Sequence, residues 1–134
     1  IYTTGNTLSL HDALPIYCTR GGVAASLCEI AEAAGCAIEI EETALPVREA
    51  TRGLCEILGL DPLYLANEGT LVAFVPEAQA DAALAAMRAT PEGRGAAIVG
   101  RATGGPAGTV GLRTAFGGLR SVDLPVGEPL PRIC

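Results

Sequence analysis

The first third of the chain alternates between helical and strand-like spacing of its hydrophobic residues. Apolar residues at 23, 27, 30, 31 and 34 recur on one helix face, and Gly35 follows where helices commonly end. Thr19 stands where a side-chain oxygen can cap the helix start. Residues 36–41 then alternate, with cysteine and isoleucine on one side and glutamate on the other. This pattern predicts a helix that ends at Gly35, followed by a half-buried strand whose acidic residues, together with Glu42, form a solvated strand edge.

Two further helices and a buried strand are predicted between residues 46 and 91. After Pro46 an apolar stripe runs through 47, 50, 51, 54, 55 and 58, and Gly59 ends it. Residues 63–69 form a loop, and the nearly all-apolar run 70–75 is typical of a central strand. Pro76 is placed to open a third helix, with residues 80, 83, 84 and 87 on its inner face.

The last third of the chain predicts strands at about 96–103, 109–114 and 119–124, joined by glycine-rich turns. Helices therefore come early and strands late. This order favours an α+β fold in which helices pack on a mixed or antiparallel sheet.

Composition narrows the class of protein. The chain has 134 residues, of which 49% are hydrophobic and 18% charged, which is typical of one globular domain. Its net charge of −6 argues against nucleic acid or an anionic membrane as the main partner. No apolar run approaches the roughly 20 residues of a membrane span. The five cysteines have irregular spacing and no Cys-x-x-Cys or Cys/His pairing, so we expect free thiols, a reducing cytoplasm and no metal site.

The two ends differ from the middle. Residues 1–17 show no clear period, and the stretch 8–16 resembles translated sequencing-adapter sequence. We therefore expect a non-native or disordered leader over 1–18, a domain over 19–124, and a flexible proline-rich tail over 125–134.

The tail ends in Cys134. Three prolines in seven residues disfavour a helix, and an extended path of eleven residues from Leu124 could reach roughly 30 Å. Such an arm could present its thiol to a site elsewhere. The alternative is an unremarkable chain terminus.

Two internal motifs are candidates for a site. In Thr19-Arg20-Gly21-Gly22, two glycines at a helix start expose N–H groups to an anion, and Arg20 adds positive charge. Asn67-Glu68-Gly69 places a glutamate directly before a buried strand. The alternatives are a helix start with a surface arginine and a solvated loop acid.

Taken together, these motifs resemble the C-terminal half of the HypE family of hydrogenase maturation proteins, the carbamoyl dehydratases, from about residue 19 to the last residue. The matching segments are Thr19-Arg20-Gly21-Gly22, Leu45-Pro46-Val47, Cys55-Glu56-Ile57-Leu58-Gly59-Leu60-Asp61, Ala66-Asn67-Glu68-Gly69 and Leu130-Pro131-Arg132-Ile133-Cys134. The resemblance implies the C-terminal domain of the aminoimidazole ribonucleotide synthetase-like fold.

The resemblance also implies a reaction. The family dehydrates a carboxamide on its terminal cysteine to a thiocyanate with ATP, as the source of the cyanide ligands in [NiFe] hydrogenases. Carried over by position, Cys134 is the carrier, Glu68 the candidate base and Asn67 the group that orients the carboxamide. Thr19, Arg20, Gly21 and Gly22 line the phosphate path.

The same resemblance implies cofactor and partners. ATP with Mg would be bound mainly by an N-terminal domain that this chain lacks, so the isolated chain is not expected to be active. Partners would be a carbamoyltransferase, the iron-cyanide scaffold proteins and, in the full-length protein, a second copy. One alternative is a non-catalytic carrier module that presents Cys134 to partners. Another is a generic ferredoxin-like binding domain, in which Cys134 has no role.

Overall fold

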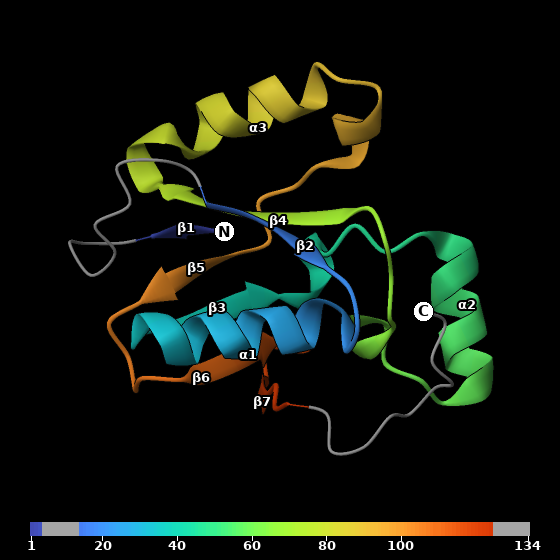
Figure 1. The fold of residues 1–134 in the computed structure, drawn as a ribbon. Coiled ribbons are helices and arrows are strands. Elements are labelled where there is room, and N and C mark those ends of the chain that lie inside the picture. Colours follow the sequence, from blue (N-terminus) through green and yellow to red (C-terminus); the bar gives the residue numbers. More distant parts are fainter. Residues whose placement is uncertain (4–13, 125–134) are drawn as a thin grey trace.

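The computed structural model describes residues 1–3 and 14–124, which form one mixed sheet with helices packed against it (Figure 1). Its strands are β1 (Tyr2–Thr3), β2 (Leu14–Cys18), β3 (Ala37–Glu41), β4 (Thr70–Pro76), β5 (Gly100–Thr103), β6 (Thr109–Arg113) and β7 (Leu119–Ser121). Its α-helices are α1 (Gly22–Ala34), α2 (Glu49–Leu58) and α3 (Ala80–Arg88). Short 3₁₀ turns cover 42–44, 62–64, 77–79 and 92–95.

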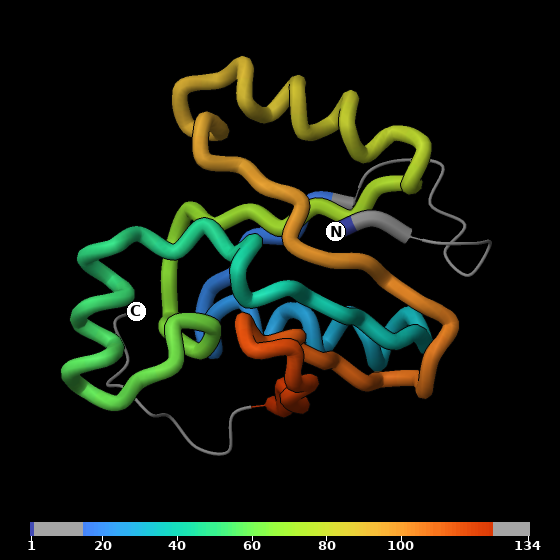
Figure 2. The backbone as a smooth tube through the Cα atoms, turned by 180° about the vertical axis from the view of Figure 1, so that it is seen from behind, coloured from blue at the N-terminus to red at the C-terminus, as the bar shows by residue number. Residues whose placement is uncertain are grey.

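The strand order is β2-β4-β1-β5-β3-β6-β7. β1 runs parallel to both of its neighbours, β3 is antiparallel to β5 and parallel to β6, and the two outer pairs β2–β4 and β6–β7 are antiparallel. The predicted α+β class with a mixed sheet is confirmed. Seen from behind, α2 and α3 lie at separate ends of the molecule (Figure 2).

The core forms where α1 covers the sheet. The buried face of α1 includes Ala24, Leu27 and Ala31, and it packs with buried side chains of the strands, namely Ile38, Ile40, Phe74, Val110 and Leu112. The predicted end of this helix is also confirmed, because Gly35 adopts a left-handed conformation and its N–H bonds to the last turn.

Free cysteines contribute to this core, and their unpaired thiols agree with the prediction. Cys18, Cys28, Cys36 and Cys55 are all buried and unpaired. Burial raises the pKa of the Cys18, Cys28 and Cys36 thiols, because a thiolate is poorly solvated there. These three side chains therefore behave as small apolar residues.

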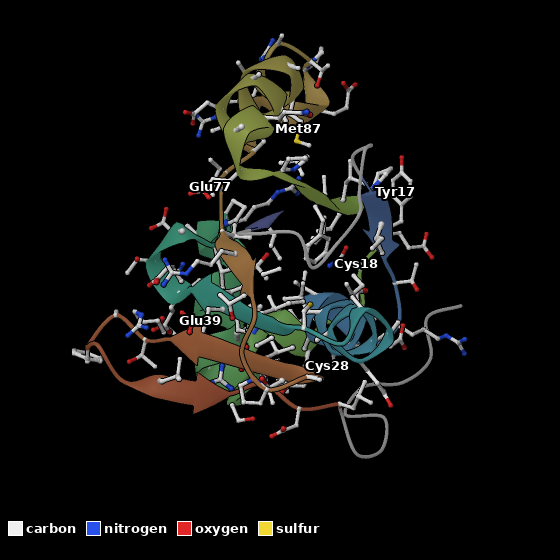
Figure 3. All side chains as sticks on the ribbon, turned by 90° about the vertical axis from the view of Figure 1, so that its left-hand side faces the viewer. Tyr17, Cys18, Cys28, Glu39, Glu77 and Met87 are labelled. Atoms are coloured by element: carbon white, nitrogen blue, oxygen red, sulfur yellow. The ribbon has the colours of Figure 1, made fainter. Side chains whose placement is uncertain are left out.

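The acidic residues of β3 do not form a solvated sheet edge. β3 lies between β5 and β6, and its Glu39 points to the face opposite Cys28 and α1 (Figure 3). Glu39 pairs with Arg101 at 3.2 Å and with Arg113 at 3.7 Å, and Arg113 also pairs with Glu41 at 3.3 Å. The expected solvated edge is therefore a cross-strand ion-pair network on a central strand.

The predicted apolar stripe of α2 is mostly not buried. Cys55 is buried, but Leu54 is 56% exposed and Leu58 58% exposed. Helical periodicity correctly predicted a helix that ends at Gly59, but it could not show which neighbour covers the apolar face.

The disorder expected as one possibility for the leader over 1–18 does not hold for residues 14–18. These residues form β2 and pair with β4 along their whole length, from Leu14 opposite Phe74 to Cys18 opposite Thr70. Tyr2 and Thr3 also pair within the sheet. Residues 4–13 and the predicted tail 125–134 lie outside the described residues.

The remaining elements follow the predictions with shifted bounds. Pro76 closes β4, and a 3₁₀ turn precedes α3, so this helix begins at Ala80. None of the helices in the described part of the chain has the length and apolar character that a bilayer span requires.

Two phenylalanines allow a matched test of the core. Phe74 is fully buried, whereas Phe116 is 100% exposed. We expect Phe74→Ala to lower the free energy of unfolding by about 3–5 kcal/mol, because it leaves a cavity in the buried core. Phe116→Ala should change it by less than about 0.5 kcal/mol. Urea denaturation of both variants measures this, and similar losses would contradict the packing described.

Candidate active site

The two predicted motifs meet in the structure. The carbonyl oxygen of Thr19 accepts a hydrogen bond from the N–H of Gly22 at 3.2 Å and another from the N–H of Asn67 at 3.3 Å. The turn that opens α1 is therefore joined by backbone to the loop before β4. Residues 48 positions apart in the sequence contribute to one surface.

Gly22 makes this contact sterically possible. Its φ is 64°, in the left-handed region that favours glycine. A Cβ at this position would lie 2.4 Å from the carbonyl oxygen of Leu63 and 2.6 Å from that of Leu65. The start of α1 and the segment 61–69 thus pack backbone against backbone, with no space for a side chain.

The start of α1 is not capped by Thr19, contrary to the prediction. Gly21 is the N-cap residue, with a φ of 72°, and no side chain accepts a hydrogen bond there. The N–H groups of Val23 and Ala24 therefore have no partner within the helix. The first turn contains no acidic side chain, and Arg20 is exposed without an ion pair in the described part of the chain. This end of α1 is suited to an anion.

Asn67 has a buried polar atom with an unused acceptor. Its Oδ1 is shielded from solvent and has no hydrogen-bond partner among the described residues. Leaving such an acceptor unpaired costs about 1–3 kcal/mol, so a ligand that donates an N–H there would be favoured. The neighbouring Glu68 carboxylate is exposed.

The segment 61–69 is also attached to the end of the described chain, which the sequence analysis did not predict. The Asp61 carboxylate pairs with Arg120 at 2.7 Å, and the Tyr64 hydroxyl donates to the carbonyl oxygen of Asp123 at 3.0 Å. The only sequence signal here was the Asp61-Pro62 turn. Nothing in the spacing indicated that the turn contacts β7.

A cavity of about 330 Å³ lies beside this segment, between α2, residues 59–63 and the strands β6 and β7. Its lining includes Cys55, Leu60, Leu63 and Arg120, and none of the predicted site residues that the structure describes. Cys134 lies outside the described residues. Within residues 1–3 and 14–124, no cluster of His, Cys, Asp and Glu side chains could hold a metal ion.

Residues 17–113 match the family described as AIR synthase related protein, C-terminal domain. The chain belongs to this family. It is 71% identical over 116 residues to the carbamoyl dehydratase HypE of Rhodobacter capsulatus, an alignment that covers 87% of this chain and 34% of the relative. It is 50% identical over 118 residues to HypE of Escherichia coli strain K12, again with 87% and 34% covered. The chain thus spans about a third of the length of these relatives.

Solved structures agree with the sequence matches. The fold superposes on a hydrogenase maturation protein HypE in complex with ATP with a TM-score of 0.83 and 43% identity, covering 91% of this chain and 38% of that one. It superposes on a chain of a HypE-HypF complex with a TM-score of 0.79 and 39% identity, covering 84% and 36%. The predicted fold and family resemblance are therefore confirmed.

Gly22 and Gly35 provide a matched test of the contact at the site. Both have left-handed backbones, but a Cβ at Gly35 would meet nothing within 4 Å. Gly35→Ala should cost about 1–2 kcal/mol from backbone strain alone. Gly22→Ala should cost about 1–3 kcal/mol more, because the new methyl group collides with the carbonyls of Leu63 and Leu65. Equal losses in chemical denaturation would contradict the close contact.

Proposed function

We propose that this chain is the C-terminal part of a carbamoyl dehydratase that acts in [NiFe] hydrogenase maturation. The observation that carries the proposal is the junction of Asn67 and Glu68 with the uncapped start of α1 through the carbonyl of Thr19. An amide-recognising group, a carboxylate and an anion-binding helix end then share one surface. These are the three functions that ATP-dependent dehydration of an amide requires.

The proposed reaction converts an S-carboxamide on Cys134 into a thiocyanate. ATP supplies a phosphoryl group that turns the poor amide-oxygen leaving group into a phosphate ester. The C–O bond then breaks, phosphate leaves with its electron pair, and the amide nitrogen loses two protons over the two steps to form the C≡N bond. The balanced products are thiocyanate, ADP and inorganic phosphate.

Asn67 and Glu68 act on the nitrogen side of the carboxamide. The unpaired Oδ1 of Asn67 accepts a hydrogen bond from the amide N–H and so orients the group. The Glu68 carboxylate takes the N–H proton as phosphate departs. Because Glu68 is exposed in this chain, the proposal requires the remainder of the full-length protein to cover it.

The start of α1 acts on the oxygen side. Its free N–H groups and the Arg20 guanidinium stabilise phosphate charge in the proposed path, which passes along Thr19, Gly21 and Gly22. Most of the site for ATP and Mg²⁺ would lie outside this chain, consistent with its coverage of 38% of a HypE described in complex with ATP. No step depends on a metal ligand from this chain.

The carrier thiol and its partners complete the proposal. Cys134 would receive its carbamoyl group from a carbamoyltransferase maturation protein, which a HypE-HypF complex among the similar structures supports. It would pass the cyano group to an iron-cyanide scaffold complex in the cytoplasm, and the full-length protein would be a homodimer.

A non-catalytic carrier is the second candidate, favoured by the exposure of Glu68. In that case Cys134 is loaded and unloaded by other proteins, and Glu68 has no chemical role. Substitution of Glu68 separates the two functions.

We expect Glu68→Gln in the full-length protein to leave Cys134 carbamoylated but to lower its conversion to thiocyanate by about 10²–10⁴-fold, because the proton acceptor is lost. Mass spectrometry of the terminal peptide after ATP addition measures the loss of one water. Glu77→Gln is the matched control, because Glu77 lies beyond the opposite end of the seven-residue strand β4 (Figure 3), about 20 Å away. Wild-type conversion in Glu68→Gln would favour the carrier.

We also expect the 134-residue chain alone to hydrolyse no ATP above background, because only the helix end and Arg20 would contact phosphate. A phosphate-release assay, with the full-length protein as the positive control, measures this. Hydrolysis by the isolated chain that Glu68→Gln abolishes would contradict the division of the site between two domains.

A further inference from the structure

The segment 61–69 holds the root of the C-terminal tail as well as the candidate site residues. The Tyr64 hydroxyl donates to the carbonyl oxygen of Asp123 at 3.0 Å and accepts from the N–H of Asp123 at 3.2 Å. One side-chain oxygen therefore satisfies both backbone groups of the second-last described residue. Asn67 follows Tyr64 by only three positions.

A second contact joins the same segment to β7. Arg120 donates to Asp61 Oδ2 at 2.7 Å, while Asp61 Oδ1 accepts from the N–H of Leu63 at 2.9 Å. Asp61 thereby links the turn before the site to the strand before the tail. β7 needs this support, because it is a three-residue edge strand whose residues are all exposed.

A third contact comes from α1. The thiol of Cys28 donates to the carbonyl oxygen of Val122 at 3.2 Å, and Val122 is itself buried. α1 is also the helix whose first residue, Gly22, packs against Leu63 and Leu65. The site and the tail root are thus attached to the same two elements.

We propose that Tyr64 and the Asp61–Arg120 pair are positioning residues that clamp the root of the carrier arm to the loop carrying Asn67 and Glu68. This inference rests on the proposed function. The clamp fixes the position at which the ten residues 125–134 begin. The point from which Cys134 reaches the dehydration site therefore stays constant relative to that site. It does not touch the reacting atoms.

The clamp sets the effective concentration of the carrier thiol at the site. If β7 detaches, the stretch between the last attached residue and Cys134 lengthens from the ten residues 125–134 to the twenty-one residues 114–134. For a flexible tether the local concentration of its end falls roughly as the −3/2 power of length, which is about threefold here. The chemical step itself should not change.

The test compares delivery of the carboxamide on the arm with delivery in solution. The clamp variant is Tyr64→Phe with Arg120→Ala in the full-length protein. We expect its single-turnover dehydration of carbamoylated Cys134 to be slower than wild type by at most about threefold, because Val122 keeps its bonds to Cys28 and to Val110. In the second arm of the test, the clamp variant and the wild type both also carry Cys134→Ala, and the substrate is a carbamoylated synthetic peptide of residues 125–134. The two proteins should dehydrate this peptide at the same rate. A variant with Tyr64→Phe and Arg120→Lys should regain part of the rate of dehydration on the arm, because a cation again faces Asp61.

The matched control is Tyr17→Phe with Arg94→Ala, which removes the same groups from exposed positions and should change neither rate. The clamp is overturned if the clamp variant keeps the wild-type rate on the arm, or if arm and peptide reactions fall equally, which would indicate damage to the site.

Hydrogen exchange separates this proposal from the proposed function. Exchange at the Asp123 amide should accelerate in the clamp variant, because its acceptor, the Tyr64 hydroxyl, is gone. Unchanged exchange there overturns the clamp whatever the activity. A wild-type protein that never dehydrates Cys134 instead overturns the proposed function, while the exchange result still decides whether the root is clamped.

Discussion

The candidate site depends on the absence of a side chain at Gly22. With its left-handed backbone this residue lies against the carbonyls of Leu63 and Leu65, where a Cβ would approach within 2.4 Å. This contact lets Thr19 accept hydrogen bonds from both sides of the junction. Any larger residue would separate the helix end from the loop that carries Asn67 and Glu68. Backbone packing thus determines the geometry of the site, and the polar side chains extend from this packed backbone.

The packed backbone of the site is rigid because α1 is anchored in the core. Its buried face packs with the central strands β3 and β6, and Ile38 and Ile40 have no exposed surface. Functional groups at the end of a packed helix keep their positions better than groups on free loops. The same helix contacts Val122 through Cys28. The candidate site, the core and the root of the C-terminal tail are therefore all attached to α1.

Local sequence patterns predicted the helices and strands well, but they did not predict which residues surround each of them. Periodicity and Gly35 were sufficient for α1, and alternation was sufficient for β3. The outward-facing glutamates were expected at an edge because the sequence does not contain the strand order that places Arg101 and Arg113 beside Glu39. For a related reason, the sequence did not show that the apolar stripe of α2 is mostly exposed, because residue spacing cannot identify which neighbour covers a helix face. Thr19-Gly22 and Asn67-Glu68 were each recognised as candidates, but their junction and the Tyr64 contact depend on tertiary structure.

The most direct measurement is the infrared spectrum of the full-length protein whose Cys134 has been carbamoylated, before and after ATP is added. The account predicts that a nitrile stretch appears only after ATP, shifts when the carbamoyl nitrogen is ¹⁵N, and is absent from Cys134→Ser. A protein that consumes ATP without developing this band, or that develops it without Cys134, would contradict the account.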